Sequence, residues 1–243
     1  MTLLTNYCYT YEYKYIDLSL KALWEPFLDL EAEINTFVPR PLTDYEEERR
    51  KKIKYYRDLN PSHTDEMITE LADQDITFVA LERVQFIDQF ENRVMTHHIM
   101  VVLLSQALCE AAINTILTIG FTATNNNNCI GLLKTAKIQD KWNIFPKIIS
   151  SSYEFQKGTG LDETLTYLIN KRNEISHPKI DMQDQGIKLG KDTRIIIKEE
   201  IRWMKRLFSL PYDLSEYVEL QLRDIASIKV FNDRSPILRA KEH

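Results

Sequence analysis

The chain of 243 residues is long enough for one large domain, or for a domain with a sizeable extension. Apolar residues make up 44% and charged residues 28%, which is ordinary for a globular protein and argues against a disordered chain. Only 6 residues are glycine and none precedes Gly120, so the turns of a β-sandwich or a Rossmann-type α/β fold lack their usual residues. The composition therefore predicts an all-α fold.

The charge is distributed unevenly along the chain. Residues 1–128 contain 11 Lys and Arg against 20 Asp and Glu, a net charge of −9, whereas residues 129–243 contain 20 against 16, a net charge of +4. The total of −5 argues against broad, non-specific binding of nucleic acid. It leaves room for a local basic site in the second half.

The cysteines and the apolar segments indicate the compartment. Cys8, Cys109 and Cys129 form no C-x-x-C pair, so we expect neither a disulfide framework nor a Cys-based zinc site, and a reduced, cytoplasmic setting. The first residues lack the basic and apolar regions of a signal peptide. The most apolar run, residues 99–119, contains polar residues such as Glu110, which favours a buried core helix over a membrane span.

The beginning of the chain has an unusual alternation. Tyrosine occupies every second position from Tyr7 to Tyr15, which is the period of a strand with one tyrosine face. We expect a short extended arm packed on the helices; the alternative is an aromatic ladder on which bases stack. Farther along, residues 65–119 contain neither Gly nor Pro, which predicts one very long helix, or two with a joint near Asn92.

One helix carries the residues with the most chemistry. Thr159 and Asp162 form a capping-box pattern that opens it, and an apolar stripe faces the core, formed by Leu161, Leu165, Leu168 and Ile175. Arg172 falls in the middle of this stripe. A buried guanidinium needs a partner, which could be a carboxylate, a facing subunit or the phosphate of a ligand.

The same helix should end at His177, because the residue before Pro178 avoids the α conformation. Asn173 precedes His177 by four residues, at a spacing that allows its amide to hydrogen-bond the imidazole. Arg172, Asn173 and His177 can therefore converge at one helix end.

Two other polar patterns lie on the preceding long helix. Gln106, Glu110 and Asn114 form a stripe at i, i+4 and i+8, which faces either solvent or a cleft where Glu110 would pair with Arg172 or His177. The adjacent His97 and His98 point about 100° apart on a helix and no third ligand follows, so we expect no metal site.

The run from Arg172 to Pro178 resembles the signature of the HEPN superfamily, in which an Arg is followed by a polar residue, often Asn, and then by a His near the helix end. The form here has four residues between Arg172 and His177. The helix around residues 103–114 is similar to the acidic-residue helix of many members. The resemblance covers roughly residues 95–222, which indicates an HEPN-like domain at 94–230, a helical extension at 1–93 and a tail at 231–243.

The resemblance implies a four- or five-helix bundle, usually a homodimer, that cleaves RNA without a metal or cofactor and often acts as a toxin or in anti-phage defence. His177 would be the general acid or base, Arg172 would hold the scissile phosphate, and Asn173 would orient either, with Glu110 as a further active-site residue. An antitoxin or regulatory protein is an expected partner. Some members carry a tyrosine after the motif that a partner antitoxin nucleotidylates. Residues 178–191 contain no tyrosine, so we do not expect that mode of control here.

A second hypothesis remains open. In it the chain is a non-catalytic helical dimer that recruits a partner through its acidic N-terminal half, with Arg172 as a structural ion pair and His177 as a helix terminator.

Overall fold

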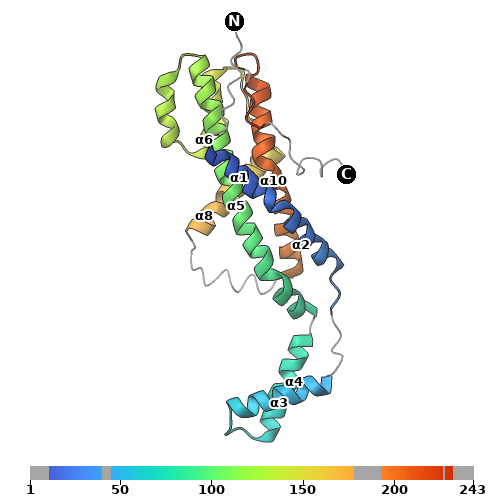
Figure 1. Ribbon diagram of the computed structural model, residues 1–243. Coiled ribbons are helices and arrows are strands. Elements are labelled where there is room, and N and C mark those ends of the chain that lie inside the picture. Colours follow the sequence, from blue (N-terminus) through green and yellow to red (C-terminus); the bar gives the residue numbers. More distant parts are fainter. Residues whose placement is uncertain (1–10, 40–44, 81, 178–192, 227, 232–243) are drawn as a thin grey trace. The chain divides into compact units, whose positions relative to one another are not determined.

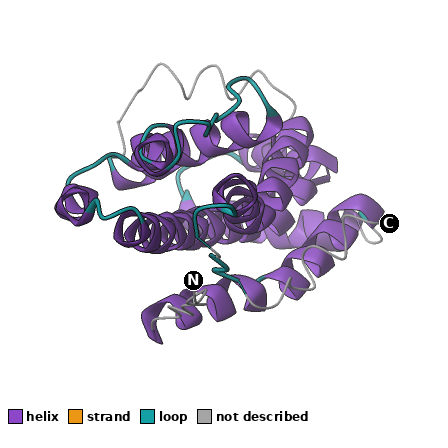
Figure 2. Cartoon of the chain, turned by 90° about the horizontal axis from the view of Figure 1, so that it is seen from above, coloured by secondary structure: helices purple, strands orange, loops and turns teal. Residues whose placement is uncertain are grey.

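The computed structural model describes residues 11–39, 45–80, 82–177, 193–226 and 228–231, and all regular structure in these ranges is helical (Figures 1 and 2). The predicted all-α class is therefore confirmed. The elements in chain order are α1 (Tyr11–Ala22), α2 (Trp24–Thr36), α3 (Tyr45–Leu59), α4 (Asp65–Ala80), α5 (Glu82–Ala123), the 3-10 helix η1 (Asn127–Lys134), α6 (Ile138–Asn143), α7 (Pro146–Ile149), α8 (Gly160–Ser176) and α10 (Thr193–Leu222).

The chain divides into two compact units. Unit 1 comprises Met1–Leu28, Thr96–Asp181 and Glu199–His243, and unit 2 comprises Asp29–Met95 and Met182–Lys198. One division falls between Met95 and Thr96, and the described residues 11–28 group with unit 1.

The core of unit 1 lies between α5, α8 and α10. Leu108, Ile113, Leu165 and Leu207 are among its fully buried residues. A buried hydroxyl ties two of these helices together, because Ser105 Oγ donates to the Leu207 carbonyl over 3.0 Å. Burial of the apolar side chains in this core is the main favourable contribution to the folding free energy of unit 1.

Aromatic rings attach the start of the chain to α10. The ring of Phe208 lies 5.0 Å from Trp24 and 5.2 Å from Phe27, between ring centroids. The Tyr212 hydroxyl donates to the buried carboxylate of Asp17 over 2.5 Å. These contacts satisfy the buried polar group and place α1 and the start of α2 on the core of unit 1.

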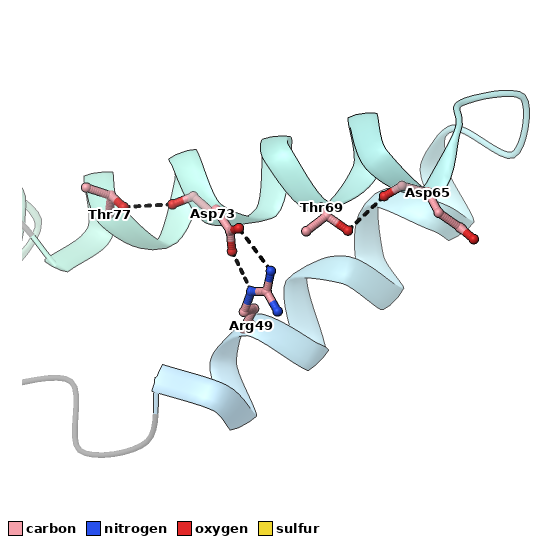
Figure 3. Close-up of polar contacts among 5 residues, drawn as sticks. All are labelled: Arg49, Asp65, Thr69, Asp73 and Thr77. Carbon is pink, nitrogen blue, oxygen red and sulfur yellow. Dashed lines mark hydrogen bonds and ion pairs between the residues drawn. The ribbon is translucent and has the colours of Figure 1, made fainter.

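Unit 2 contains a helical hairpin of α3 and α4 held by ion pairs. Arg49 Nε and Nη2 donate to the two carboxylate oxygens of Asp73 over 2.6 and 3.0 Å (Figure 3), and Lys52 Nζ lies 2.6 Å from Asp75. Ile68 and Ile76 are buried on the inner face of α4. Because α3 is rich in charge, its attachment depends on these cross-pairs as well as on apolar burial.

The expected extended arm is wrong for the part that the structure describes. The chain is helical from Tyr11, and the buried residues Asp17, Leu20 and Trp24 follow a helical period. A strand needs a pairing partner, and the described residues offer none, whereas this inward-facing set fits a helix on α10. Tyr7 and Tyr9 lie outside the described residues.

Asn92, where the sequence allowed a joint between two helices, lies inside α5 with its side chain exposed, so the described helix continues through this position. An exposed Asn costs little in a helix and nothing at this position breaks the backbone pattern. The buried rings of Phe86 and Phe90 hold this part of α5 within unit 2.

Among the described helices, one passes the length and composition test for a membrane span, over Gln85–Ala123, and its most apolar window of 18 residues has a mean hydropathy of 1.7. In its most apolar window 44% of the residues are buried inside the structure. Its buried face is the core face of α5, where Ser105 has its partner within the chain. These contacts agree with the core helix expected from the sequence.

Candidate functional site

Helix α8 begins and ends where the sequence indicates. Thr159 is the N-cap residue, and the Asp162 carboxylate accepts a hydrogen bond from the Gly158 N–H over 2.9 Å. At the other end, His177 leaves the helical conformation at φ −134°, and its N–H donates to the Asn173 carbonyl over 2.9 Å. The prediction that the helix ends at His177 is confirmed, since the preceding-proline effect stops it there.

Arg172 lies where the apolar stripe of α8 leaves the core. Leu165 and Leu168 are fully buried, whereas Arg172 and Ile175 are half-buried. Within the described part of the chain, the guanidinium has one hydrogen bond, from Nη1 to Asn173 Oδ1 over 3.3 Å. The stripe therefore reaches solvent at its C-terminal end, and Arg172 does not need the buried carboxylate that its position in the stripe suggested.

Asn173 and His177 are both exposed at this end. The side-chain oxygen of Asn173 accepts a hydrogen bond from the Arg172 guanidinium, so this side chain points to Arg172 and not to the imidazole of His177. The backbone carbonyl of Asn173 accepts a hydrogen bond from the backbone N–H of His177. The structure thus brings the three residues to one helix end, with Asn173 as the link between the other two.

Glu110 is not brought to them. Its Oε1 forms an ion pair with Lys141 of α6 and accepts a hydrogen bond from Lys141 Nζ over 2.7 Å. The Lys141 side chain is 1% exposed, whereas that of Glu110 is 43% exposed. The amide oxygens of Gln106 and Asn114, on the same stripe, are buried. Glu110 therefore contacts α6 with its carboxylate partly in solvent, and its pairing with Arg172 or His177 stays a prediction.

A second cluster, which the sequence patterns missed, lies on another face of α8. His98 Nδ1 of α5 lies 3.0 Å from Glu200 Oε2 of α10, and the Tyr167 hydroxyl of α8 donates to the same oxygen over 2.8 Å. Tyr167 also lies 3.2 Å from His98 Nε2, and Lys171 Nζ lies 3.7 Å from Glu200 Oε1. We call His98, Tyr167, Lys171 and Glu200 the inner cluster.

The inner cluster is largely buried, and its electrostatics follow from that. Burial alone would raise the pKa of Glu200, but hydrogen bonds and charge from His98, together with Tyr167 and Lys171, outweigh it and lower the pKa to about 2. Burial and the neighbouring Glu200 carboxylate raise the pKa of Tyr167 far above its ordinary value. The cluster is thus a carboxylate-centred link between three helices, and Tyr167 acts in it as a hydrogen-bond donor.

The signal for this cluster was present but weak. Tyr167, Lys171 and Glu174 recur at i, i+4 and i+7 on α8, which marks a polar face next to the apolar stripe. The partners His98 and Glu200 lie on other helices, so only packing brings them together. Among the described residues no group of three or more His, Cys, Asp or Glu side chains could hold a metal ion.

Comparison of the chain with protein-family models, with curated proteins and with solved structures found no match. The candidate site is the end of α8, where Arg172 is half-buried and Asn173 and His177 are exposed, and the inner cluster lies on another face of the same helix.

Proposed function

We propose that the chain is a metal-independent endoribonuclease of HEPN type, with Arg172, Asn173 and His177 in its active site. The observation that carries the proposal is that a guanidinium and an imidazole reach solvent at one helix end, with the Asn173 amide bonded to the guanidinium. The resemblance of this run to the HEPN signature supports the same assignment.

The chemistry suits these groups. RNA carries its own nucleophile, the 2′-hydroxyl, so cleavage needs proton transfer and stabilisation of charge on the phosphate. His177 exchanges the proton as general base or acid, and Arg172 binds the non-bridging phosphate oxygens as charge accumulates on them. Asn173 fixes the guanidinium. The products carry a 2′,3′-cyclic phosphate and a 5′-hydroxyl.

A homodimer completes the site in this proposal. One chain supplies one proton-transfer group, whereas attack and departure on opposite sides of the phosphorus need a base and an acid. The exposed apolar residues Ile99, Met100 and Leu103 on α5 support a second copy, because a single chain leaves them in water. The excess of basic residues after position 128, doubled in the dimer, attracts RNA.

Glu110 has no supported role in the reaction. Its carboxylate is already engaged by Lys141, and a direct contact with Arg172 or His177 stays a prediction. The proposed biological setting is a cytoplasmic toxin or anti-phage effector whose activity an antitoxin or regulatory protein restrains.

The test is to incubate the purified chain with total RNA in the presence of EDTA and to sequence the cleaved ends. We expect cleavage that survives chelation and a loss of about 10²–10⁴ in rate for His177→Ala. His97→Ala, at a histidine outside the α8 end, serves as the matched control and should cleave normally. Cleavage that disappears with EDTA and returns with Mg²⁺ would overturn the mechanism.

One observation favours the non-catalytic alternative, a module that binds a partner protein. The outer face of α4 is acidic and exposed at Asp65, Glu66 and Glu70. If the chain pulls down a basic partner through this face and leaves RNA intact at every concentration tested, the alternative replaces the nuclease.

A further inference from the structure

An open cavity of about 650 Å³ lies in unit 1 at the beginning of α8. Its apolar walls come from three helices and include Trp24, Leu161 and Leu210. The indole of Trp24 packs against the ring of Phe208 in a T-shaped contact, with 5.0 Å between ring centroids. The cavity is large enough for a flat heteroaromatic group and has the apolar lining that such a group prefers.

Polar groups surround the same cavity. Lys205 and Arg206 of α10 contribute to its lining, together with Gln156 and Asp213. The segment carrying Gln156 is anchored to α10, because the Tyr217 hydroxyl donates to the neighbouring Glu154 carbonyl over 2.6 Å. Two cations beside an apolar recess, with an amide and a carboxylate nearby, provide contacts for a phosphate and for the hydrogen-bonding edge of a base.

A line of stacked side chains leads from this cavity along α8 and α10. The Arg206 guanidinium lies 5.0 Å from the Trp203 ring, and Trp203 stacks on Tyr167 at 4.1 Å and 6° between planes. Lys171 Nζ lies 5.8 Å from the Tyr167 ring, and the next residue is Arg172. These contacts occupy the faces of both rings within the chain, so the row connects the cavity wall to the end of α8 that carries Arg172.

The spacing fits one strand. Leu161 in the cavity wall and Arg172 at the helix end are 11 residues apart on α8, roughly 17 Å at about 1.5 Å per residue. A single strand of a few nucleotides spans this length, whereas a duplex would first have to unstack and unpair a base before it could enter a recess.

The geometry points to a base-recognition pocket: the cavity receives an unstacked nucleobase of the single-stranded RNA whose scissile phosphate lies at Arg172. This inference rests on the proposed function and adds the substrate class, unpaired RNA, and the residues that select the cleavage position. Lys205 and Arg206 contact the phosphate next to that base, and Trp24 and Leu161 pack on its faces.

The experiment measures binding and not cleavage. The full-length chain carrying His177→Ala, which removes the proposed proton-transfer group, is titrated with fluorescently labelled single-stranded decamers of uridine, adenosine and cytidine, and anisotropy is recorded. Adding Leu161→Trp, which fills the cavity from a half-buried position, should weaken binding about tenfold or more and remove any preference among the three decamers. Ile169→Trp places the same side chain at another half-buried position of α8 outside the cavity and should leave binding unchanged.

A decamer with abasic sites supplies the second arm. The abasic decamer should bind the His177→Ala protein as weakly as the intact decamers bind the protein that also carries Leu161→Trp. Adding Leu161→Trp should not weaken binding of the abasic decamer further. Equal binding of the abasic and intact decamers, or an unchanged affinity in Leu161→Trp with the melting temperature retained, overturns the pocket. Cleavage by the unmodified chain is scored separately, so a nuclease without base recognition and a base-binding protein without cleavage give different results.

Discussion

The imidazole of His98 and the carboxylate of Glu200 lie 3.0 Å apart, between residues that are 102 positions distant in the chain and belong to different helices. The Tyr167 hydroxyl closes the arrangement from a third helix. These polar contacts and the buried side chains of Leu165 and Leu168 therefore fix the rotation of α8 about its own axis. That rotation determines the direction in which Arg172 points.

Removing one member of this link should destabilise the fold. His98→Ala leaves the largely buried Glu200 carboxylate without a main partner, and we expect the free energy of unfolding to fall by about 3 kcal/mol. His97→Ala, one residue earlier and less buried, is the control and should change it by less than about 1 kcal/mol. Urea denaturation measures both, and equal values for the two variants would contradict the importance assigned to the cluster.

The same carboxylate predicts a pH dependence. The folded-state pKa of Glu200 is about 2, below its ordinary value of 4.5, so its stabilising contribution is complete above about pH 4.5 and is lost as the pH falls toward 2. The difference in unfolding free energy between the unmodified chain and Glu200→Gln should be constant from pH 5 to 6 and shrink below about 4.5. Denaturation series at several pH values test this, and Glu199→Gln, at the exposed neighbour, should show no such trend.

The pair of Lys141 and Glu110 should respond asymmetrically to substitution. Glu110→Gln leaves a fully buried ammonium without its counter-charge and should cost about 3 kcal/mol, whereas Lys141→Met leaves a carboxylate that is 43% exposed and can be hydrated, at a cost of less than about 1 kcal/mol. Thermal and urea unfolding distinguish these outcomes. A Glu110→Gln protein that is fully stable but fails to cleave RNA would instead place Glu110 in the active site.

The turn before α8 depends on one glycine. Gly158 has φ +73°, and an added Cβ would meet no atom within 4 Å, so Gly158→Ala tests backbone strain alone. We expect a loss of about 1 kcal/mol, with no loss for Gly160→Ala, where φ is ordinary and the space is also open. Unfolding free energies that are equal for both variants would show that the turn does not require the left-handed conformation.

The proposed dimer site can be tested by mixing two inactive proteins. Arg172→Ala should abolish cleavage with little change in melting temperature, because Arg172 is half-buried and bonded only to Asn173 within the described residues. Cleavage restored by mixing Arg172→Ala with His177→Ala subunits would show that the two residues act across an interface. Sedimentation at the same concentrations checks the assembly, and a fully active monomer would contradict the dimer.

What the sequence predicted correctly were local features. The proline after His177 ended α8 at that residue, and the scarcity of glycine indicated the helical class. The alternation of tyrosines gave a wrong prediction because a period of two in one residue type does not show which residues face inward. The buried residues Asp17 and Leu20 instead follow the period of a helix.

Pairings between distant segments were out of reach. The partner of Glu110 is 31 positions away, on a six-residue helix that periodicity does not orient, and the spacing of its own stripe offered only solvent or the α8 end. Likewise, nothing in the neighbourhood of His98 indicates Glu200. Such contacts depend on how helices pack, and a helical period fixes only the face of each helix.

The enclosure of Lys141 has a consequence for its chemical reactivity. An amine that is 1% exposed and bound to a carboxylate is shielded from acylating reagents, in contrast to exposed amines such as those of Lys134 and Lys147 on either side of it. Lys141 can therefore be acylated only when α6 separates from α5. Its labelling rate, read by mass spectrometry against these two neighbours, reports how often this part of unit 1 opens in the folded protein.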